Sequence, residues 1–304
     1  MGTVTLSVDA ELGWGWHDLE CPPSERVEAG RTGWQRLLDL FDEYEVPATW
    51  AIVGHLFLDE CDGRHDDHPL GNDWFRRETG AWRNRPDLRF GADLVRAVQS
   101  AGVDHDLGSH TFSHVPLWDS ETSRETAREE IERSVGVAES CGLSLDSFVY
   151  PRNRVGHRDL LAECGFRAYR GQRPTTRADG GRLGRATKLV RGTVPGTHPP
   201  VVEPHVDEYG LVNVPASLYL FGFEGRARTV AEAVYADPIL LKAKRGIDAV
   251  AASDGVFHMW LHPNNLVAER DLARVEAVLS LVAERRRAAD INVATMAGVA
   301  DAVG

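Results

Sequence analysis

Strand-like and helix-like segments alternate along almost the whole chain of 304 residues. Residues 3–9 alternate apolar and polar side chains, which is typical of a strand with one buried face. Residues 33–44 have apolar side chains at helical spacing, residues 48–53 predict the next strand, and residues 229–253 are predicted to be mostly helical. The alternation recurs about seven times without a linker or an internal repeat. It predicts one α/β domain, residues 1–304, built as a distorted (β/α) barrel of about seven strands.

Residues 55–91 interrupt the alternation as a long polar insertion with several glycines and prolines. A loop of this length in a compact domain is often functional. Its large aromatic side chains could stack on sugar rings as a partial lid or pack as a small cluster beneath the loop. They are Trp74, Phe75 and Trp82. Residues 65–68, His-Asp-Asp-His, could suggest a metal site, but no strand or helix fixes them, so we expect His65 and His68 to lie in a solvated loop.

The composition excludes several classes of function. A net charge of −12 argues against nucleic-acid binding, which selects basic surfaces. No apolar run is long enough to cross a membrane. Residues 1–9 lack the features of a signal peptide, so we expect a cytoplasmic protein. The four cysteines have no metal-binding or disulfide spacing and are expected to be reduced and structural. The oligomeric state stays open.

Two histidines four residues apart follow the strand predicted for residues 103–107. If a helix begins at Ser109, His110 and His114 lie on one of its faces and can reach a single ion. Imidazole is the usual ligand of zinc and similar metals, although the pair could also be ordinary packed histidines. A metal site here needs a third ligand, preferably a carboxylate from another strand end.

The first predicted strand ends in two carboxylates. Asp9 and Glu11 are two residues apart and point the same way in an extended chain. They could be an acid–base group beside a metal ligand, or a capping aspartate and a solvated glutamate.

All of these candidates directly follow predicted strands, and in a parallel barrel such strand ends meet on one face. The set comprises Asp9, Glu11, His110, His114, Pro151, Arg152 and His262. The pattern therefore predicts one composite site.

The order of these motifs resembles the polysaccharide deacetylase family, also called the NodB-homology or carbohydrate esterase family 4 group, over about residues 3–300. Residues 7–11 resemble its Asp-rich strand end, and residues 110–114 match its His-(Ser/Thr)-x-x-His motif. Residues 150–153 place Pro and Arg after a strand, and residues 260–263 place a histidine after an apolar strand. Family members commonly have adjacent aspartates where this chain has Asp9-Ala10-Glu11, an arrangement similar to the intracellular, allantoinase-like branch.

The resemblance implies a metal-dependent hydrolase that removes an N-acetyl group from an amino-sugar-containing glycan or glycan precursor. It implies Asp9 as the base and His262 as the acid, with Arg152 orienting Asp9 and Arg154 as the second candidate. The implied ligands of a divalent metal are Glu11, His110 and His114. Zinc is expected first, with cobalt, manganese, nickel or iron as alternatives. The substrate-binding residues expected are Trp14, Trp16, Pro151 and Asn153.

Two other functions remain open at this point. One is hydrolysis of a different C–N amide bond, such as that of a cyclic ureide, on the same fold. The other is a catalytically inactive carbohydrate-binding homologue, for which the altered first motif is the only support.

Overall fold

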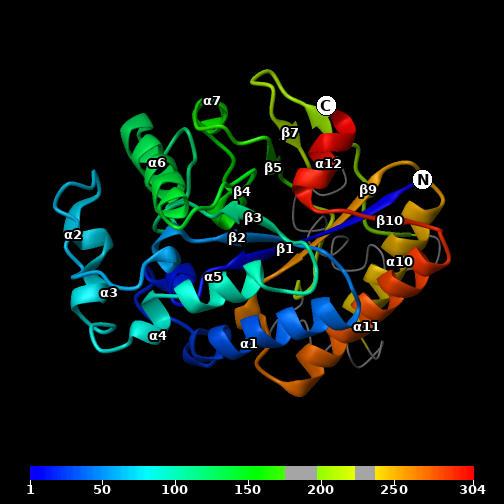
Figure 1. The fold of residues 1–304 in the computed structure, drawn as a ribbon, viewed down its shortest axis with the longest axis horizontal. Coiled ribbons are helices and arrows are strands. Elements are labelled where there is room, and N and C mark those ends of the chain that lie inside the picture. Colours follow the sequence, from blue (N-terminus) through cyan, green and yellow to red (C-terminus); the bar gives the residue numbers. More distant parts are fainter. Residues whose placement is uncertain (175–196, 223–236) are drawn as a thin grey trace, which may run out of the picture.

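The computed structural model describes residues 1–174, 197–222 and 237–304, and it is built on one ten-stranded sheet (Figure 1). The strand order is β6-β7-β5-β4-β3-β2-β1-β9-β8, with β10 also pairing with β1. The strands are β1 (Thr3–Ala10), β2 (Thr49–Ile52), β3 (Asp106–Ser109), β4 (Ser147–Val149), β5 (Ala168–Arg170), β6 (His205–Val206), β7 (Val212–Asn213), β8 (Leu218–Tyr219), β9 (Val256–Leu261) and β10 (Asn292–Val293). Every ladder between these strands is parallel except β6 with β7.

The predicted α/β fold is confirmed, and the sheet curls into a half-barrel. Two strands of only two residues, β6 and β8, raise the strand number above the sequence-based expectation. A two-residue strand is too short to leave an alternating pattern, which needs about four residues. The helix predicted for residues 229–253 starts outside the described residues, and its later part lies in α10 (Pro238–Ala251).

Helices cover the sheet, and α1, α10 and α11 lie together along one side of it (Figure 1). The α-helices are α1 (Ser24–Glu43), α2 (Gly71–Trp74), α3 (Arg76–Thr79), α4 (Pro86–Arg89), α5 (Ala92–Gln99), α6 (Arg124–Ser140), α7 (Arg158–Glu163), α10 (Pro238–Ala251), α11 (Glu269–Arg287) and α12 (Met296–Val303). The 3-10 helices are η1 (Trp14–Trp16), η2 (Gly54–Phe57), η3 (Pro151–Asn153) and η5 (Pro263–Asn265). None of the helices in the described ranges has the length and apolar character needed to cross a membrane.

The centre of the sheet is β1, which pairs with β2 on one side and β9 on the other. Its residues from Val4 to Ala10 are all buried, as expected for a strand covered on both faces. Beneath it, Trp34 of α1 stacks on Trp50 of β2 with ring centroids 5.2 Å apart. The ends of β1 and β9 are therefore held in a rigid core.

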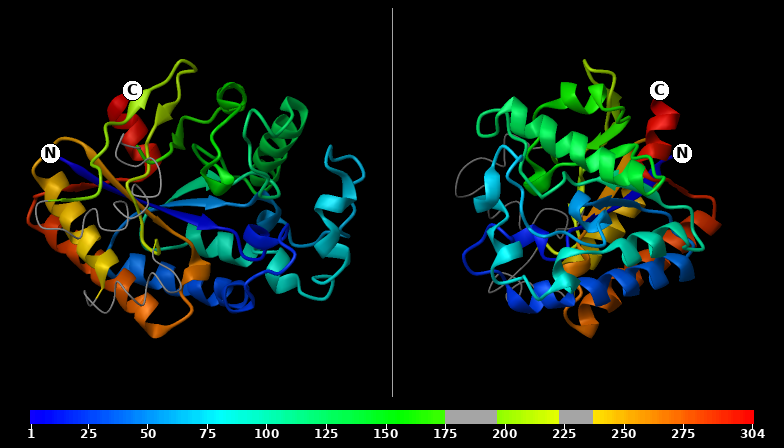
Figure 2. Two further views of the ribbon diagram at one scale, coloured as in Figure 1. Left: turned by 180° about the vertical axis from the view of Figure 1, so that it is seen from behind. Right: turned by 60° about the vertical axis from the view of Figure 1, so that its left-hand side comes forward.

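The insertion is a folded unit at the end of the molecule opposite the two termini (Figure 2). It contains η2 and the short helices α2, α3 and α4. Phe75 and Trp82 are buried, and Trp82 packs with Val27 and Leu88, which favours packing over a sugar-binding lid. The expectation that His65 and His68 are solvated is wrong, because both are buried in contact with buried glutamates.

The turn after β9 packs against α1 and is hydrogen-bonded to α1 and to the segment that follows β1. Asn264 donates hydrogen bonds to the carbonyl oxygens of Leu12 at 3.1 Å and Arg26 at 2.9 Å. A Cβ added to Gly33 of α1 would lie 2.1 Å from the carbonyl oxygen of Pro263. Glycine at residue 33 thus allows α1 to approach η5 closely.

Replacing this glycine tests the contact. Gly33→Ala should lower the free energy of unfolding by about 1–3 kcal/mol, because the methyl group overpacks against backbone. Gly136→Ala in α6 is the matched control, since nothing lies within 4 Å of its added Cβ. That variant should be about 0.4–1 kcal/mol more stable than the parent. Urea unfolding measures both, and equal stability of the two variants would contradict the packing described here.

Candidate active site

Side chains from four parallel strands converge at one edge of the sheet. Asp9 lies in β1 and Glu11 follows it, while Arg170 ends β5. His110 follows β3 and His262 follows β9. Because parallel strands end at the same edge, residues that are far apart in sequence meet there.

Glu11 lies at the centre of this group. Its Oε1 atom is 3.2 Å from Nε2 of His110, 3.2 Å from Nε2 of His114 and 3.4 Å from Nε2 of His262. Glu11 is 4% exposed, and His110 and His114 are equally buried. The acid and the histidine pair that the sequence suggested as one set are therefore in contact.

The histidine pair lies on a loop and not on the helix that the spacing suggested. Thr111 and His114 adopt positive φ angles of 61° and 63°, which lie outside the right-handed α-helical region. Backbone amides of η2 fix this loop: Gly54 donates to the Thr111 carbonyl at 2.8 Å, and His55 donates to the Phe112 carbonyl at 2.9 Å. The two imidazoles face Glu11 because of this turn.

The donor set fits a metal ion. Nδ1 of His110 lies 2.7 Å from the Val149 carbonyl, which can only accept, so this nitrogen carries the hydrogen. Nε2 then presents a lone pair to the Glu11 carboxylate 3.2 Å away, and a cation between them removes the repulsion. His114 offers a second Nε2 to the same oxygen. One carboxylate and two imidazoles are a common donor set of catalytic zinc sites.

Asp9 forms a buried bidentate ion pair with Arg170. The Nη1–Oδ1 and Nη2–Oδ2 distances are 2.5 and 2.7 Å. Burial raises the pKa of Asp9, but the charge and hydrogen bonds of Arg170 outweigh it and hold the pKa below its usual value. Arg170 also donates to Ser7 Oγ and to Asn153 Oδ1, and its guanidinium lies 4.4 Å from the Trp260 ring centroid.

Arg170 is a site residue that sequence reasoning missed. Arg152, predicted to orient Asp9, instead pairs with Asp18 at 2.5 Å on the rim. Arg152 lies on η3 with a positive φ of 55°, and the ion pair with Asp18 occupies its guanidinium. The signal was present, because Arg170 also ends a predicted strand, but the choice between arginines depends on the sheet geometry.

His262 completes the group on the side of β9. Its Nε2 atom lies 3.7 Å from Asp9 Oδ2, and its Nδ1 atom lies 3.3 Å from both Asn265 Oδ1 and the Tyr219 hydroxyl. Burial lowers the pKa of His262, but the charges of Glu11 and Asp9 dominate and raise it above its ordinary value. Both carboxylates therefore favour a proton on this imidazole.

A cavity of about 220 Å³ opens onto these groups. Trp16 and Asn153, both predicted to bind substrate, line it together with Asp9, Glu11, His114 and His262. Trp14 does not face it, because its ring is 1% exposed and its Nε1 atom donates to the Arg89 carbonyl. Pro151 is likewise buried. A Cβ on Gly15 would lie 1.9 Å from Glu11 Oε2, so glycine leaves room for the carboxylate.

Comparison with known proteins supports the predicted family. Residues 21–169 match the family model of polysaccharide deacetylases, which confirms the resemblance and supports a hydrolase. No curated protein matches the chain.

Solved structures share the fold. One from Mycobacterium smegmatis, described as a polysaccharide deacetylase, is 17% identical with a TM-score of 0.64 over 99% of this chain and 89% of that one. Puue allantoinase is 15% identical with a TM-score of 0.63 over 98% and 89%. A Pseudomonas aeruginosa PAO1 protein, also described as a polysaccharide deacetylase, is 14% identical with a TM-score of 0.61 over 98% and 89%.

From the buried ion pair between Asp9 and Arg170 we predict how substitutions change the free energy of unfolding. Arg170→Met should lower the free energy of unfolding by about 3–5 kcal/mol, because it leaves a buried carboxylate without its partner. The loss should shrink as the pH falls, since a lowered pKa stabilises the native state only where Asp9 is ionised. Adding Asp9→Asn should restore part of the stability.

Denaturant unfolding at several pH values measures these effects. Arg152→Met is the matched control, because its ion pair lies on the surface and should contribute about 1 kcal/mol or less. A loss in Arg152→Met as large as that in Arg170→Met would contradict the assignment of Arg170.

Proposed function

We propose that this chain, whose residues 21–169 match the polysaccharide deacetylase family, is a metal-dependent hydrolase that removes an N-acetyl group from an amino sugar. The observation that carries the proposal is the buried Glu11, with three imidazoles around one of its oxygens and the Asp9–Arg170 pair beside it. Hydrolysis of an unactivated amide needs an activated water, a base and an acid, and this group offers all three.

Glu11, His110 and His114 would hold the metal, because their ligand atoms converge and are buried. Zinc suits this donor set best, with cobalt, manganese, nickel and iron as alternatives. When bound, such a metal activates water and polarises a carbonyl group. The hydrogen bond from Nδ1 of His110 to the Val149 carbonyl fixes the ring so that Nε2 faces the site.

Asp9 is proposed as the base. Arg170 donates a hydrogen bond to each carboxylate oxygen of Asp9. Asp9 therefore stays ionised and cannot rotate away from the cavity. An ionised carboxylate so placed can accept the proton of an attacking water. Arg170 takes over the orienting role that the resemblance gave to Arg152.

His262 is proposed as the acid that protonates the departing amine. Its Nε2 faces the cavity, and contacts from Tyr219 and Asn265 to Nδ1 fix the ring. Burial lowers the pKa of His262, but the charge of Asp9, which is not a proposed metal ligand, raises it and helps to keep a proton on this imidazole.

The surroundings of the site favour a substrate that carries a sugar and a negative charge. A second cavity of about 390 Å³ shares Arg152, Asn153, Tyr219 and Trp260 with the first. The stacked rings of Tyr219 and Trp260, with centroids 4.2 Å apart, form a wall on which a sugar ring can lie. Arg152, Arg154 and Arg173 also line this cavity. We infer a phosphorylated or nucleotide-linked N-acetyl sugar, a glycan precursor, as the substrate class.

Removing the proposed base or acid tests the chemistry. Asp9→Asn and His262→Gln should each lower kcat for acetate release from N-acetyl sugars by about 10²–10⁴-fold, because each removes one proton transfer. Metal content should stay near that of the parent chain, since neither residue is a proposed ligand. Cys21→Ser at an exposed cysteine is the control and should keep full activity.

Near-parental acetate release by both variants would contradict the roles given to Asp9 and His262. Ring opening of allantoin with no acetate release would favour the alternative amidohydrolase. Glycan binding without either reaction, with metal supplied, would favour a non-catalytic role.

The arginine-lined cavity makes a prediction about substrate charge. Arg154→Gln should raise KM for a nucleotide-linked N-acetyl sugar by about 10–100-fold, the effect of losing one charged hydrogen bond. KM for the uncharged sugar should change little, and kcat should stay near the parental value. Steady-state kinetics on both substrates measures the difference, and equal changes in KM for both would contradict an anion-binding role.

A further inference from the structure

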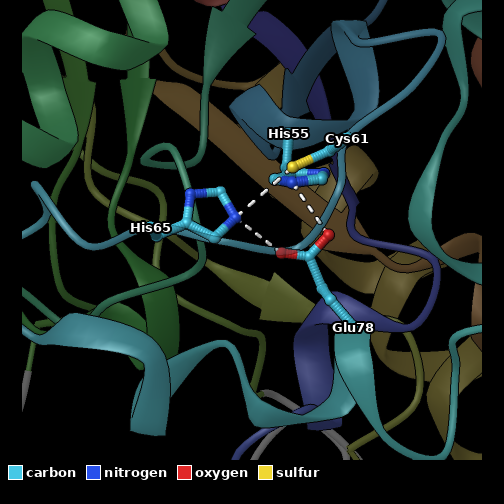
Figure 3. Close-up of side chains that lie close together, drawn as sticks. All are labelled: His55, Cys61, His65 and Glu78. Carbon is cyan, nitrogen blue, oxygen red and sulfur yellow. Dashed lines mark hydrogen bonds and ion pairs between the residues drawn. The ribbon is translucent and has the colours of Figure 1, made fainter.

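The insertion brings four potential metal ligands together outside the site described above. They are His55 of η2, Cys61 and His65 of the following loop, and Glu78 of α3 (Figure 3). One ligand atom from each lies within 4.8 Å of the others. His55 is 0%, Glu78 2% and His65 4% exposed, so the group lies in the interior of the insertion.

The distances within this group suit tetrahedral coordination. Ligand atoms about 2.0–2.3 Å from a tetrahedral zinc lie about 3.3–3.6 Å from one another. Here Cys61 Sγ is 3.5 Å from His65 Nε2, and His55 Nε2 is 3.1 Å from Glu78 Oε1. His65 Nε2 and Glu78 Oε2 are closer, at 2.7 Å, which is a hydrogen-bond distance that a metal would open slightly.

His55 presents an unused lone pair to the other three groups. Its Nδ1 atom lies 3.4 Å from the Arg89 carbonyl, which can only accept, so the hydrogen belongs on Nδ1. The Nε2 atom is buried and lies 3.1 Å from Glu78 Oε1, an ion-pair contact that needs a second proton on the ring. With its only hydrogen on Nδ1, the ring presents a lone pair to the lone pairs of the carboxylate, and a metal ion at the centre of the group would satisfy both.

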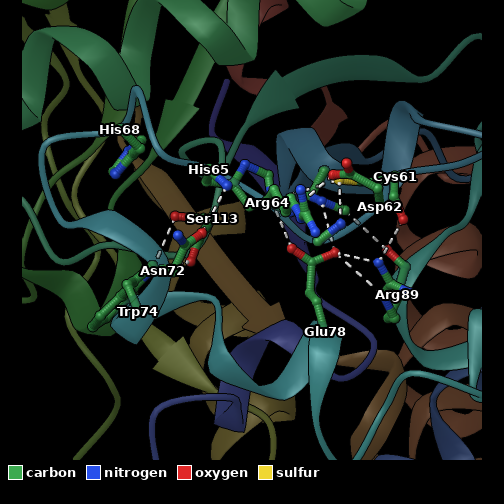
Figure 4. Close-up of polar contacts among 12 residues, drawn as sticks. Cys61, Asp62, Arg64, His65, His68, Asn72, Trp74, Glu78, Arg89 and Ser113 are labelled. Carbon is green, nitrogen blue, oxygen red and sulfur yellow. Dashed lines mark hydrogen bonds and ion pairs between the residues drawn. The ribbon is translucent and has the colours of Figure 1, made fainter.

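A second shell of contacts holds the ligands in place (Figure 4). Arg89 donates to Glu78 Oε1 at 2.7 Å and to the Cys61 carbonyl at 2.9 Å, so it fixes both the carboxylate and the loop that carries the thiol. The amide of Gly63 donates to Cys61 Sγ at 3.3 Å. The ring of His65 stacks on Phe75 with centroids 3.7 Å apart. Such outer contacts are typical of metal sites.

We propose that His55, Cys61, His65 and Glu78 bind a second divalent metal ion, with zinc as the natural occupant of this donor set. Two imidazoles, a thiolate and a carboxylate leave no position open for water, so the site is structural. The alternative is a proton-shared network in which a charged His65 pairs with Glu78. In that network Glu78 pairs with Nε2 of both histidines, at 3.1 Å and 2.7 Å, and the cobalt titration below distinguishes it from a metal site.

The second site would stabilise the loop of the first. The backbone amide of His55 donates to the Phe112 carbonyl between His110 and His114. From the same insertion, Trp74 Nε1 donates to Ser113 Oγ at 2.9 Å. His68 contacts Glu130 at 3.0 Å, and Glu130 in turn accepts from the Ser113 amide at 2.7 Å. A metal bound in the insertion therefore fixes the segment that carries the active-site histidines.

Cobalt(II) titration of the metal-free full chain tests the proposal, because only this site contains a cysteine. We expect a thiolate-to-cobalt charge-transfer band in the near ultraviolet that reaches full intensity at no more than two cobalt ions per chain, one for each proposed site, and disappears when zinc is added. A saturated parent chain without this band would overturn the proposal, whatever the result of the activity assays.

Variants separate this site from the first one. Cys61→Ser and His65→Gln should abolish the band and weaken zinc binding at this site by more than about tenfold, since loss of an outer partner alone costs 10–100-fold. Cys21→Ser, the matched cysteine control, should keep the band. His114→Gln should also keep it, even if the metal of the first site is lost.

The result remains decisive if a variant does not fold. Circular dichroism identifies such a variant, and the spectrum of the parent chain then decides alone. In a folded Cys61→Ser chain, persistence of the band would assign it to another cysteine and overturn the proposal. Zinc should raise the Tm of the parent chain more than that of folded Cys61→Ser, and equal shifts would count against a structural role.

Discussion

Two carboxylates buried side by side set the main constraint on this structure. Asp9 and Glu11 are both almost fully removed from water, and an ionised carboxylate in such a place is unstable unless a positive charge meets it. Arg170 forms an ion pair with Asp9. Glu11 contacts imidazoles, which are also suitable ligands for a metal cation. Charge compensation therefore requires that β1, β3, β5 and β9 end at one place. The half-barrel sheet satisfies this requirement.

The sequence predicted those parts of the candidate site that lie at the ends of clearly patterned strands. Asp9, Glu11, His110, His114 and His262 each come directly after a run of strand-like residues, and the parallel arrangement brings them together without further information. The ion-pair partner of Asp9 could not be predicted this way. Its choice depends on how far the sheet curls between β1 and β5, which are separated by three strands. Arg152 lies after β4 and Arg170 is the last residue of β5, and only the three-dimensional geometry distinguishes them.

The insertion was harder to predict, for a physical reason. Its helices have four residues each, which is about one turn and too short to give a periodic apolar pattern. Their stability comes from buried polar contacts such as Arg89 with Glu78, and these join residues with no regular spacing. Trp14 and Trp16 illustrate the same limit within η1. They are only two positions apart, yet the ring of Trp14 is buried and the ring of Trp16 lines the cavity.

The two clusters solve one electrostatic problem in the same way. In each, a backbone carbonyl fixes the hydrogen on Nδ1 of a buried histidine, and Nε2 then faces a buried carboxylate. The clusters differ in access: the first borders a cavity, whereas three ligands of the second are buried and only Cys61 is partly exposed. An open site can exchange water and substrate, and an enclosed one can only hold its ion. Because the amide of His55 bonds to the loop of His110 and His114, the enclosed cluster limits how far the open one can relax. The insertion is thus part of the framework that keeps the active-site ligands in position.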